Sequence, residues 1–197
     1  MERKIIIVEG PDGSGKSTLC AALQGLGFTR LRCVPDVKAM HADRNAQPDL
    51  FWWYGERLLE YVQAETNVVV DRCYLSEQIY GPEMRGINRL GLYGVNHLHQ
   101  LAEQASVRHV FCLPPWPTVL ANWQFKRREK WDPVKRTGDY VDAEVKLHRI
   151  YQLYRQEYEA MQAIYTPGLC HVYDYTVNIT AARLLESIEE RANVSNA

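Results

Sequence analysis

The chain has 197 residues, of which 46% are hydrophobic and 24% are charged, and its formal net charge is −1. This composition fits a globular domain with a sizeable core, and its charge gives no overall field that would draw the protein to nucleic acid or to anionic lipid. No apolar run approaches the ~20 residues of a membrane span. The N-terminus carries no signal-peptide pattern, and the five scattered cysteines form no Cys-x-x-Cys pair. We therefore expect a reduced, cytoplasmic protein.

Short apolar runs recur along the chain and alternate with helical patterns. The runs at residues 5–9 and 68–70 have the apolar, β-branched content of buried parallel strands. Further strands are predicted at residues 28–34, 107–113 and 170–173. Because the segments between them have helical patterns, the strands are joined by crossovers, and we expect a parallel sheet with helices on both faces.

Apolar residues at helical spacing predict the helices between these strands. The first helix includes Leu19, and Gly25 and Gly27 then offer a stop. Pro48 and Asp49 are typical of a helix start. Further helices are predicted around residues 95–105, from Pro117 onward, over residues 140–165 and around residues 184–188.

The segment from Gly10 to Ser17 matches the pattern G-x-x-x-x-G-K-[ST]. It follows a predicted strand and precedes a predicted helix, which is the context that this pattern requires. Glycines let backbone N–H groups approach an anion closely, and the N-terminal end of the helix adds positive charge. Lys16 can then reach the β- and γ-phosphates of a nucleotide, and Ser17 can ligate Mg²⁺. The segment therefore predicts a phosphate-binding loop.

A second polar segment follows the third predicted strand. Asp71 ends that strand, so its carboxylate lies at the edge where parallel sheets bind ligands. There it can hold a water on Mg²⁺, and Arg72 beside it can bind a second phosphate. A buried structural ion pair is the alternative interpretation of this dipeptide.

Three segments resemble the thymidylate kinase family of P-loop nucleotide kinases. EGPDGSGKST is similar to the family's phosphate-binding loop, including Asp12, and DRCYLSEQIYG resembles its Asp-Arg segment. FWWYGERLLEYV resembles the helix in which an aromatic residue, here Trp53, precedes an arginine, here Arg57, by four positions. The sequence shows no repeat, low-complexity segment or linker, so we expect a single domain over residues 1–197. The resemblance implies the three-layer α/β/α P-loop kinase fold with a five-stranded parallel sheet and a basic lid. It also implies ATP and Mg²⁺ as cofactors and a deoxynucleoside monophosphate as the small-molecule acceptor.

The resemblance implies a role for each matching position. The ATP phosphates and Mg²⁺ would be bound by Asp12, Gly13, Ser14, Gly15, Lys16, Ser17 and Thr18, with Asp71 as a second metal-site residue. The acceptor would be bound by Asp12, Asp36, Trp53, Arg57, Arg72, Ser76 and Tyr80. Asp12 would lie near the 3′-hydroxyl of the acceptor sugar, the two arginines would hold its phosphate, and Trp53 would stack on its base.

Core packing is the alternative interpretation of the aromatic cluster at residues 51–54. Adjacent residues on a helix cannot all face inward, so at least one of the four side chains should be exposed.

The lid is predicted at residues 126–139, which carry six Lys or Arg residues against three Asp or Glu residues. No Lys or Arg lies between Gly10 and Gly15, so the cation that stabilises the transferring phosphoryl group must come from elsewhere. A solvated basic helix end is the alternative interpretation. The predicted catalytic residues are Lys16, Arg72 and one or more of Arg127, Arg128 and Arg136.

Two departures from the family pattern leave the acceptor open. LRCVPDVKA replaces the family's Arg-Glu-Pro-Gly-Gly loop, and Leu59 stands where a base-contacting Gln is expected. The acceptor is dTMP, another deoxynucleoside monophosphate, a modified pyrimidine nucleotide or a deoxynucleoside. For a deoxynucleoside, Asp36 would be the general base on a 5′-hydroxyl. A hydroxymethylated base in DNA, the substrate of some phage kinases, is a further alternative that the net charge disfavours. A nucleotide-binding switch module is the non-enzymatic alternative, and a homodimer remains one of the open assembly states.

Overall fold

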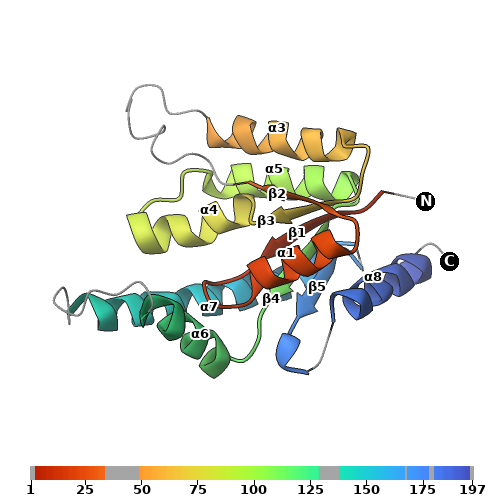
Figure 1. Ribbon diagram of the computed structural model, residues 1–197. Coiled ribbons are helices and arrows are strands. Elements are labelled where there is room, and N and C mark those ends of the chain that lie inside the picture. Colours follow the sequence, from red (N-terminus) through yellow and green to blue (C-terminus); the bar gives the residue numbers. More distant parts are fainter. Residues whose placement is uncertain (1–2, 34–48, 129–137, 167, 178–179, 196–197) are drawn as a thin grey trace.

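The computed structural model describes residues 3–33, 49–128, 138–166, 168–177 and 180–195 (Figure 1). Five strands form one parallel sheet in the order β2-β3-β1-β4-β5. They are β1 (Ile5–Glu9), β2 (Thr29–Arg32), β3 (Val68–Asp71), β4 (Arg108–Cys112) and β5 (Cys170–Tyr173). The predicted α/β fold with a five-stranded parallel sheet is therefore confirmed, and each strand lies within two residues of its predicted position.

The helices follow the predicted alternation with the strands. They are α1 (Lys16–Gly25), α3 (Leu50–Gln63), α4 (Tyr74–Tyr80), α5 (Gly91–Gln104), α6 (Trp116–Arg128), α7 (Gly138–Ile164) and α8 (Ala181–Ser195). A π-helical turn, Gly81–Arg85, continues α4, and a 3₁₀ turn, Tyr175–Val177, follows β5. The Asp49 carboxylate caps α3 by accepting the Phe51 N–H at 2.9 Å, as a helix-start residue should.

The side chains of β1 show how the sheet divides the core. Ile6 and Val8 join a cluster that α1 and α8 cover, whereas Ile5 and Ile7 join the larger cluster under α3, α4, α5 and α7. Successive residues of a strand point to opposite faces, so this apolar strand is buried on both sides. The helices therefore form two layers with the sheet between them (Figure 1).

Helix α4 was not predicted from the sequence. It has seven residues, of which Tyr74, Leu75 and Ile79 are buried. A helix of about two turns offers too few positions for an apolar period to stand out.

The carboxyl ends of the strands meet at one edge of the sheet, where several of the predicted site residues lie. The phosphate loop follows β1, the Asp71-Arg72 dipeptide ends β3, and the segment after β5 begins nearby with Asp174. Asp36, Arg136 and the side chain of Arg128 lie outside the described residues. Within the described part of the chain, no helix has both the length and the apolar content needed to cross a membrane.

Candidate active site

The phosphate loop contains glycines whose lack of a side chain lets neighbouring segments approach closely. Gly13 and Gly15 have φ angles of 86° and 89°, a conformation that side chains disfavour. A Cβ on Gly13 would lie 2.6 Å from the carbonyl oxygen of Val119, and a Cβ on Gly15 would lie 2.8 Å from the ring of Tyr175. The loop therefore packs directly against α6 and against the segment after β5.

The loop contains two buried polar groups that suit an anion. Lys16 is only 6% exposed, and its Nζ donates to the carbonyl oxygen of Pro11 at 2.6 Å. Burial, with Arg72 nearby, lowers the pKa of Lys16 to about 8, and the Asp12 charge opposes this shift. The buried Ser14 hydroxyl has no hydrogen-bond partner among the described residues. A phosphate group would supply both a counter-charge for Lys16 and acceptors for unpaired donors.

Ser17 and Asp71 meet, as the sequence predicts for a metal site. The Ser17 hydroxyl donates to Asp71 Oδ2 at 3.2 Å. Arg30 donates to the same carboxylate oxygen at 2.6 Å, a contact that the sequence analysis missed. Mg²⁺ prefers hard oxygen ligands and usually keeps several waters beside one or two carboxylates. The hydroxyl and carboxylate therefore fit Mg²⁺, although the described residues hold no group of three or more His, Cys, Asp or Glu side chains that could bind a metal.

Arg72 directly follows Asp71 in the chain and is bound by two neighbours. Its guanidinium forms an ion pair with the Asp12 carboxylate and donates to the Tyr80 hydroxyl at 3.4 Å. It also lies 4.7 Å from the centre of the Tyr80 ring. The Tyr80 hydroxyl in turn accepts the Asp12 N–H at 2.9 Å. The structure thus brings together three residues that the resemblance assigned to the acceptor.

One cavity, which we call the phosphate cleft, joins these groups and has a volume of about 460 Å³. Its lining residues are Asp12, Gly13, Gly15, Lys16, Ser17, Arg30, Arg32, Asp71, Arg72 and Lys126. Five cationic side chains thus face two carboxylates, which suits a ligand with several phosphates. Arg30 and Arg32 were not predicted, although alternate positions on a strand place both on one face of β2.

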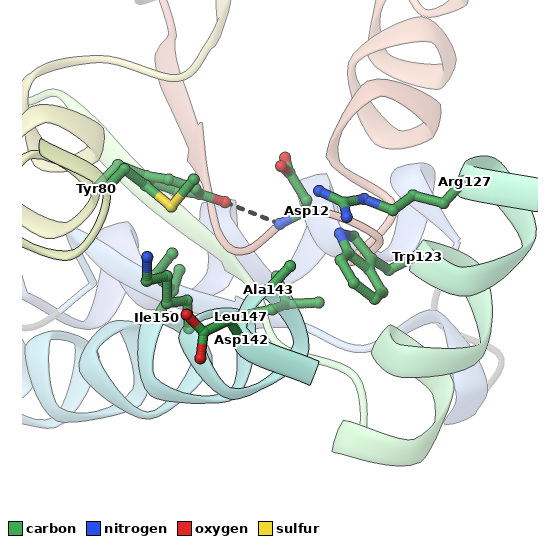
Figure 2. A pocket seen from close by; sticks show the side chains of 10 residues that line it. Asp12, Tyr80, Trp123, Arg127, Asp142, Ala143, Leu147 and Ile150 are labelled. Carbon is green, nitrogen blue, oxygen red and sulfur yellow. Dashed lines mark hydrogen bonds between the residues drawn. The ribbon is translucent and has the colours of Figure 1, made fainter. Parts of the chain in front are cut away.

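A second cavity of about 250 Å³ adjoins the phosphate cleft, because Asp12 lines both (Figure 2). We call it the Trp123 pocket. Tyr80 and Trp123 lie on opposite sides of it, and Asp142 and Leu147 of α7 contribute to its lining (Figure 2). Arg127 also lines it, with its guanidinium 4.4 Å from the centre of the Trp123 ring. The structure therefore places one of the three predicted lid arginines beside the phosphate loop.

A third cavity, the Tyr175 recess, shares Gly13 and Gly15 of the loop with the phosphate cleft and measures about 230 Å³. Its lining includes Gly15, Thr18, Asn122 and Tyr175. The Asn122 amide donates to the Gly13 carbonyl oxygen at 3.0 Å and to the Tyr175 hydroxyl at 2.6 Å. Neither Asn122 nor Tyr175 was predicted. The position of Tyr175, two residues beyond the last strand at the ligand-binding edge, was the available signal.

Three predicted acceptor residues lie away from these cavities. The Trp53 ring packs against Tyr54, and Arg57 lies 5.6 Å from the Trp53 ring centre while pairing with Glu60 at 2.6 Å. The Ser76 hydroxyl donates to the buried Glu9 at 2.7 Å. None of the three lines the phosphate cleft, the Trp123 pocket or the Tyr175 recess, so their assigned roles stay predictions.

The aromatic cluster of α3 is split as helical geometry requires. Trp52 is 67% exposed, whereas Tyr54 is 2% exposed and belongs to the core. Core packing therefore describes Tyr54, and Trp52 is an exposed member of the cluster, whereas the base contact stays a prediction.

Solved structures of other proteins share this fold. The YorR protein of Bacillus subtilis, solved in complex with phosphorylated GDP, is 19% identical, with a TM-score of 0.62 and 98% of each chain covered. Deoxyadenosine kinase from M. mycoides with bound dATP is 17% identical, with a TM-score of 0.52 and with 98% of this chain and 99% of that chain covered. No protein-family model and no curated protein matches the sequence. These likenesses show the P-loop kinase fold over nearly the whole chain.

Proposed function

We propose that the protein is an ATP- and Mg²⁺-dependent kinase that transfers a phosphoryl group to a deoxynucleoside monophosphate, in the manner of thymidylate kinase-like enzymes. The observation that carries this proposal is the phosphate cleft. It combines the phosphate loop, the Ser17–Asp71 pair and Arg72 in one cavity. A nucleotide-binding loop needs Lys16 and Ser17, but Arg72 adds a cation that a second phosphate would use.

The donor nucleotide would lie along the phosphate loop. Lys16 and the loop N–H groups would bind its phosphates, and Ser17 and Asp71 would hold Mg²⁺, which neutralises phosphate charge when bound. The Tyr175 recess opens beside the same loop and offers an aromatic ring for the base. Both compared proteins carry nucleotides, which agrees with a nucleotide as donor.

The acceptor phosphate would bind Arg72 in place of the Asp12 carboxylate. This exchange would release Asp12 toward the acceptor sugar, the position that the family resemblance gives it. The transferring phosphoryl group needs further positive charge, because its oxygens share negative charge in the transition state. Arg127 would supply this charge, a role supported by its pocket, which adjoins the phosphate cleft through Asp12.

Deoxynucleoside phosphorylation is the second candidate. The observation that favours it is that Asp12 already neutralises Arg72, so no acceptor phosphate is needed to satisfy this cation. The cleft with five cations favours the monophosphate, because a nucleoside brings no charge of its own.

A panel of acceptors with ATP and Mg²⁺, read by product mass, tests the proposal. The panel holds the four common deoxynucleoside monophosphates, modified pyrimidine monophosphates, deoxynucleosides and an oligonucleotide with hydroxymethylated bases. We expect ADP and a deoxynucleoside diphosphate as products. Faster turnover of deoxynucleosides or of the oligonucleotide would replace the proposed acceptor, and ATP binding without any phosphorylated product would indicate a switch module.

A further inference from the structure

Glu9, the last residue of β1, is a fully buried carboxylate outside the three cavities. Its Oε1 accepts the N–H of Cys73 at 2.7 Å. Its Oε2 accepts the hydroxyls of Ser76 at 2.7 Å and Tyr154 at 3.1 Å. The three donors come from the turn after β3, from α4 and from α7, so one side chain ties three segments to the end of β1.

These contacts enclose Arg72. The Arg72 N–H donates to the carbonyl oxygen of Val8 at 3.0 Å, and the next N–H, that of Cys73, donates to Glu9. Arg72 itself has a φ of 70°, in the left-handed region that non-glycine residues avoid. Val8 and Glu9 thus hold the amides on both sides of a strained residue. Such strain persists only where the surroundings determine it.

A carboxylate is an unexpected choice for this position if core packing is its only task. The four preceding residues of β1, Ile5 to Val8, are apolar and buried. Burial raises the pKa of Glu9, and the bonds from Ser76 and Cys73, together with the Arg72 and Lys16 charges, oppose this shift. Burying a charged group is costly unless hydrogen bonds compensate, and two of the three bonds to Glu9, those from Cys73 and Ser76, hold the segment that carries Arg72.

We propose that Glu9 is a positioning residue, whose two carboxylate oxygens hold residues 72–76 so that the Arg72 guanidinium stays directed toward Asp12 and Tyr80 in the phosphate cleft. The inference rests on the proposed function, because it gives Arg72 the task of binding the acceptor phosphate. It extends that function to a residue that touches neither substrate.

Two conservative variants separate the length of the side chain from its charge. Glu9→Gln keeps the length. Its amide oxygen can accept the Cys73 N–H, and its amide nitrogen can donate to the hydroxyls of Ser76 and Tyr154, which are able to accept. Glu9→Asp keeps the charge but is one methylene shorter, so it cannot reach both sides of the segment.

Steady-state kinetics and hydrogen–deuterium exchange give the readouts. In Glu9→Asp we expect the acceptor KM to rise roughly tenfold while the ATP KM stays within about threefold. In Glu9→Gln we expect both KM values within about threefold of wild type. Amide hydrogen–deuterium exchange in a peptide covering residues 71–76 should be faster than in wild type for Glu9→Asp and unchanged for Glu9→Gln. Leu184→Ala, in the core under α8 on the opposite face of the sheet, is the matched control that loses stability without touching this segment.

Four outcomes decide the inference. It holds if Glu9→Asp alone shows both the acceptor-specific KM change and the faster exchange. It is overturned if Glu9→Gln is the more impaired variant, because charge would then matter more than position. It is also overturned if Glu9→Asp behaves like Leu184→Ala, with lower stability and unchanged KM values. If the wild type phosphorylates no deoxynucleoside monophosphate, the proposed function fails, and unchanged exchange in Glu9→Asp would separately refute the positioning.

Discussion

The carboxylate of Asp12 and the guanidinium of Arg72 form an ion pair across the phosphate cleft, with the Asp12 side chain 56% exposed and that of Arg72 20% exposed. An acceptor phosphate that binds Arg72 must compete with this carboxylate. The pair therefore keeps the Arg72 side chain in place while the cleft holds no ligand. It also weakens the binding of anions that make no contact other than the one with Arg72.

Asp12→Asn should tighten the binding of a simple anion and impair turnover. The substitution removes one negative charge beside Arg72, and partly exposed ion pairs contribute up to about 1 kcal/mol, so pyrophosphate should bind a few-fold more tightly. Calorimetric titration with pyrophosphate measures this change. Asp142→Asn, which removes a carboxylate from the neighbouring pocket, is the control. Equal pyrophosphate affinity in wild type and Asp12→Asn would contradict the competition.

Lys16→Ala should abolish turnover and leave the fold intact. The buried lysine contributes charge to the donor phosphates, and loss of one such transition-state contact commonly lowers kcat by about 10²- to 10³-fold. A coupled ADP assay measures turnover, and circular dichroism checks the fold. Lys4→Ala, which removes a lysine that pairs with the distant Glu189, should keep wild-type kinetics. Near wild-type kcat in folded Lys16→Ala would refute the donor site.

At least one lid arginine should act on the chemical step. Arg127→Ala, Arg128→Ala and Arg136→Ala are compared singly, and Arg127 is the described candidate because its pocket adjoins the cleft. Arginines that stabilise a transferring phosphoryl group contribute on the order of 10³-fold or more to kcat. We expect such a loss with small changes in either KM. Arg149→Ala, an exposed arginine that pairs with Glu83, is the control. If all three variants keep kcat within a few-fold, the lid is only a basic surface.

Tyr175→Ala should raise the KM for ATP roughly tenfold and leave the acceptor KM nearly unchanged, because stacking on an aromatic ring contributes about 1–3 kcal/mol per base. Tyr175→Phe keeps the ring and removes only the hydroxyl that Asn122 contacts, so its effect should be smaller. Tyr93→Ala, at an exposed tyrosine of α5, is the control. An unchanged ATP KM in Tyr175→Ala would exclude the Tyr175 recess as the base site.

His109 should make the protein lose stability in acid. Burial, with His99 nearby, lowers the pKa of His109 to about 3 in the folded protein, below its ordinary value of 6.5. The unfolded chain therefore binds one more proton between these pH values, and the free energy of unfolding falls as pH falls through this window, by up to about 1.4 kcal/mol per unit.

Urea unfolding of wild type and His109→Phe at pH 7.5, 6 and 5 measures this slope. The variant loses the contact with the Tyr74 hydroxyl at 3.2 Å, so it starts less stable but should lose less on acidification. Leu98→Ala, a core variant on α5, should keep the wild-type slope. Parallel pH slopes in His109→Phe and wild type would contradict the assignment.

The strands were predictable because their signals are local. Strands β1 and β3 are short apolar runs that end at a polar residue, whereas β2, with the sequence Thr-Arg-Leu-Arg, has a weaker signal. Gly27 and Asp49 mark helix limits where the structure has them. The phosphate loop was predictable because its pattern encodes a backbone conformation. By contrast, Arg30 reaches Asp71 through strand pairing, and Asn122 reaches Gly13 across 109 residues of sequence. No local pattern records such contacts, which arise only once the strand order is set.

The residues predicted to bind the acceptor show a second kind of information that the sequence does not carry. The resemblance placed Ser76 and Tyr80 in one segment and assigned both to the acceptor. In the structure their hydroxyls point to different partners, Ser76 toward Glu9 and Tyr80 toward Asp12. Positions 76 and 80 are one helical turn apart, but their hydroxyls lie at different distances along side chains of unequal length. Sequence register alone therefore could not separate a residue that packs beneath the site from one that faces it.

The close packing of the phosphate loop against α6 and Tyr175 has a consequence for biosynthesis. The residues that pack against the loop, Val119 and Tyr175, are translated more than a hundred residues after it. Strand β1 likewise cannot complete its pairing until β4, its second partner in the sheet, has been translated. A nascent chain that ends before residue 175 lacks the ring beside Gly15, so the loop reaches its packed form only after that residue has been added.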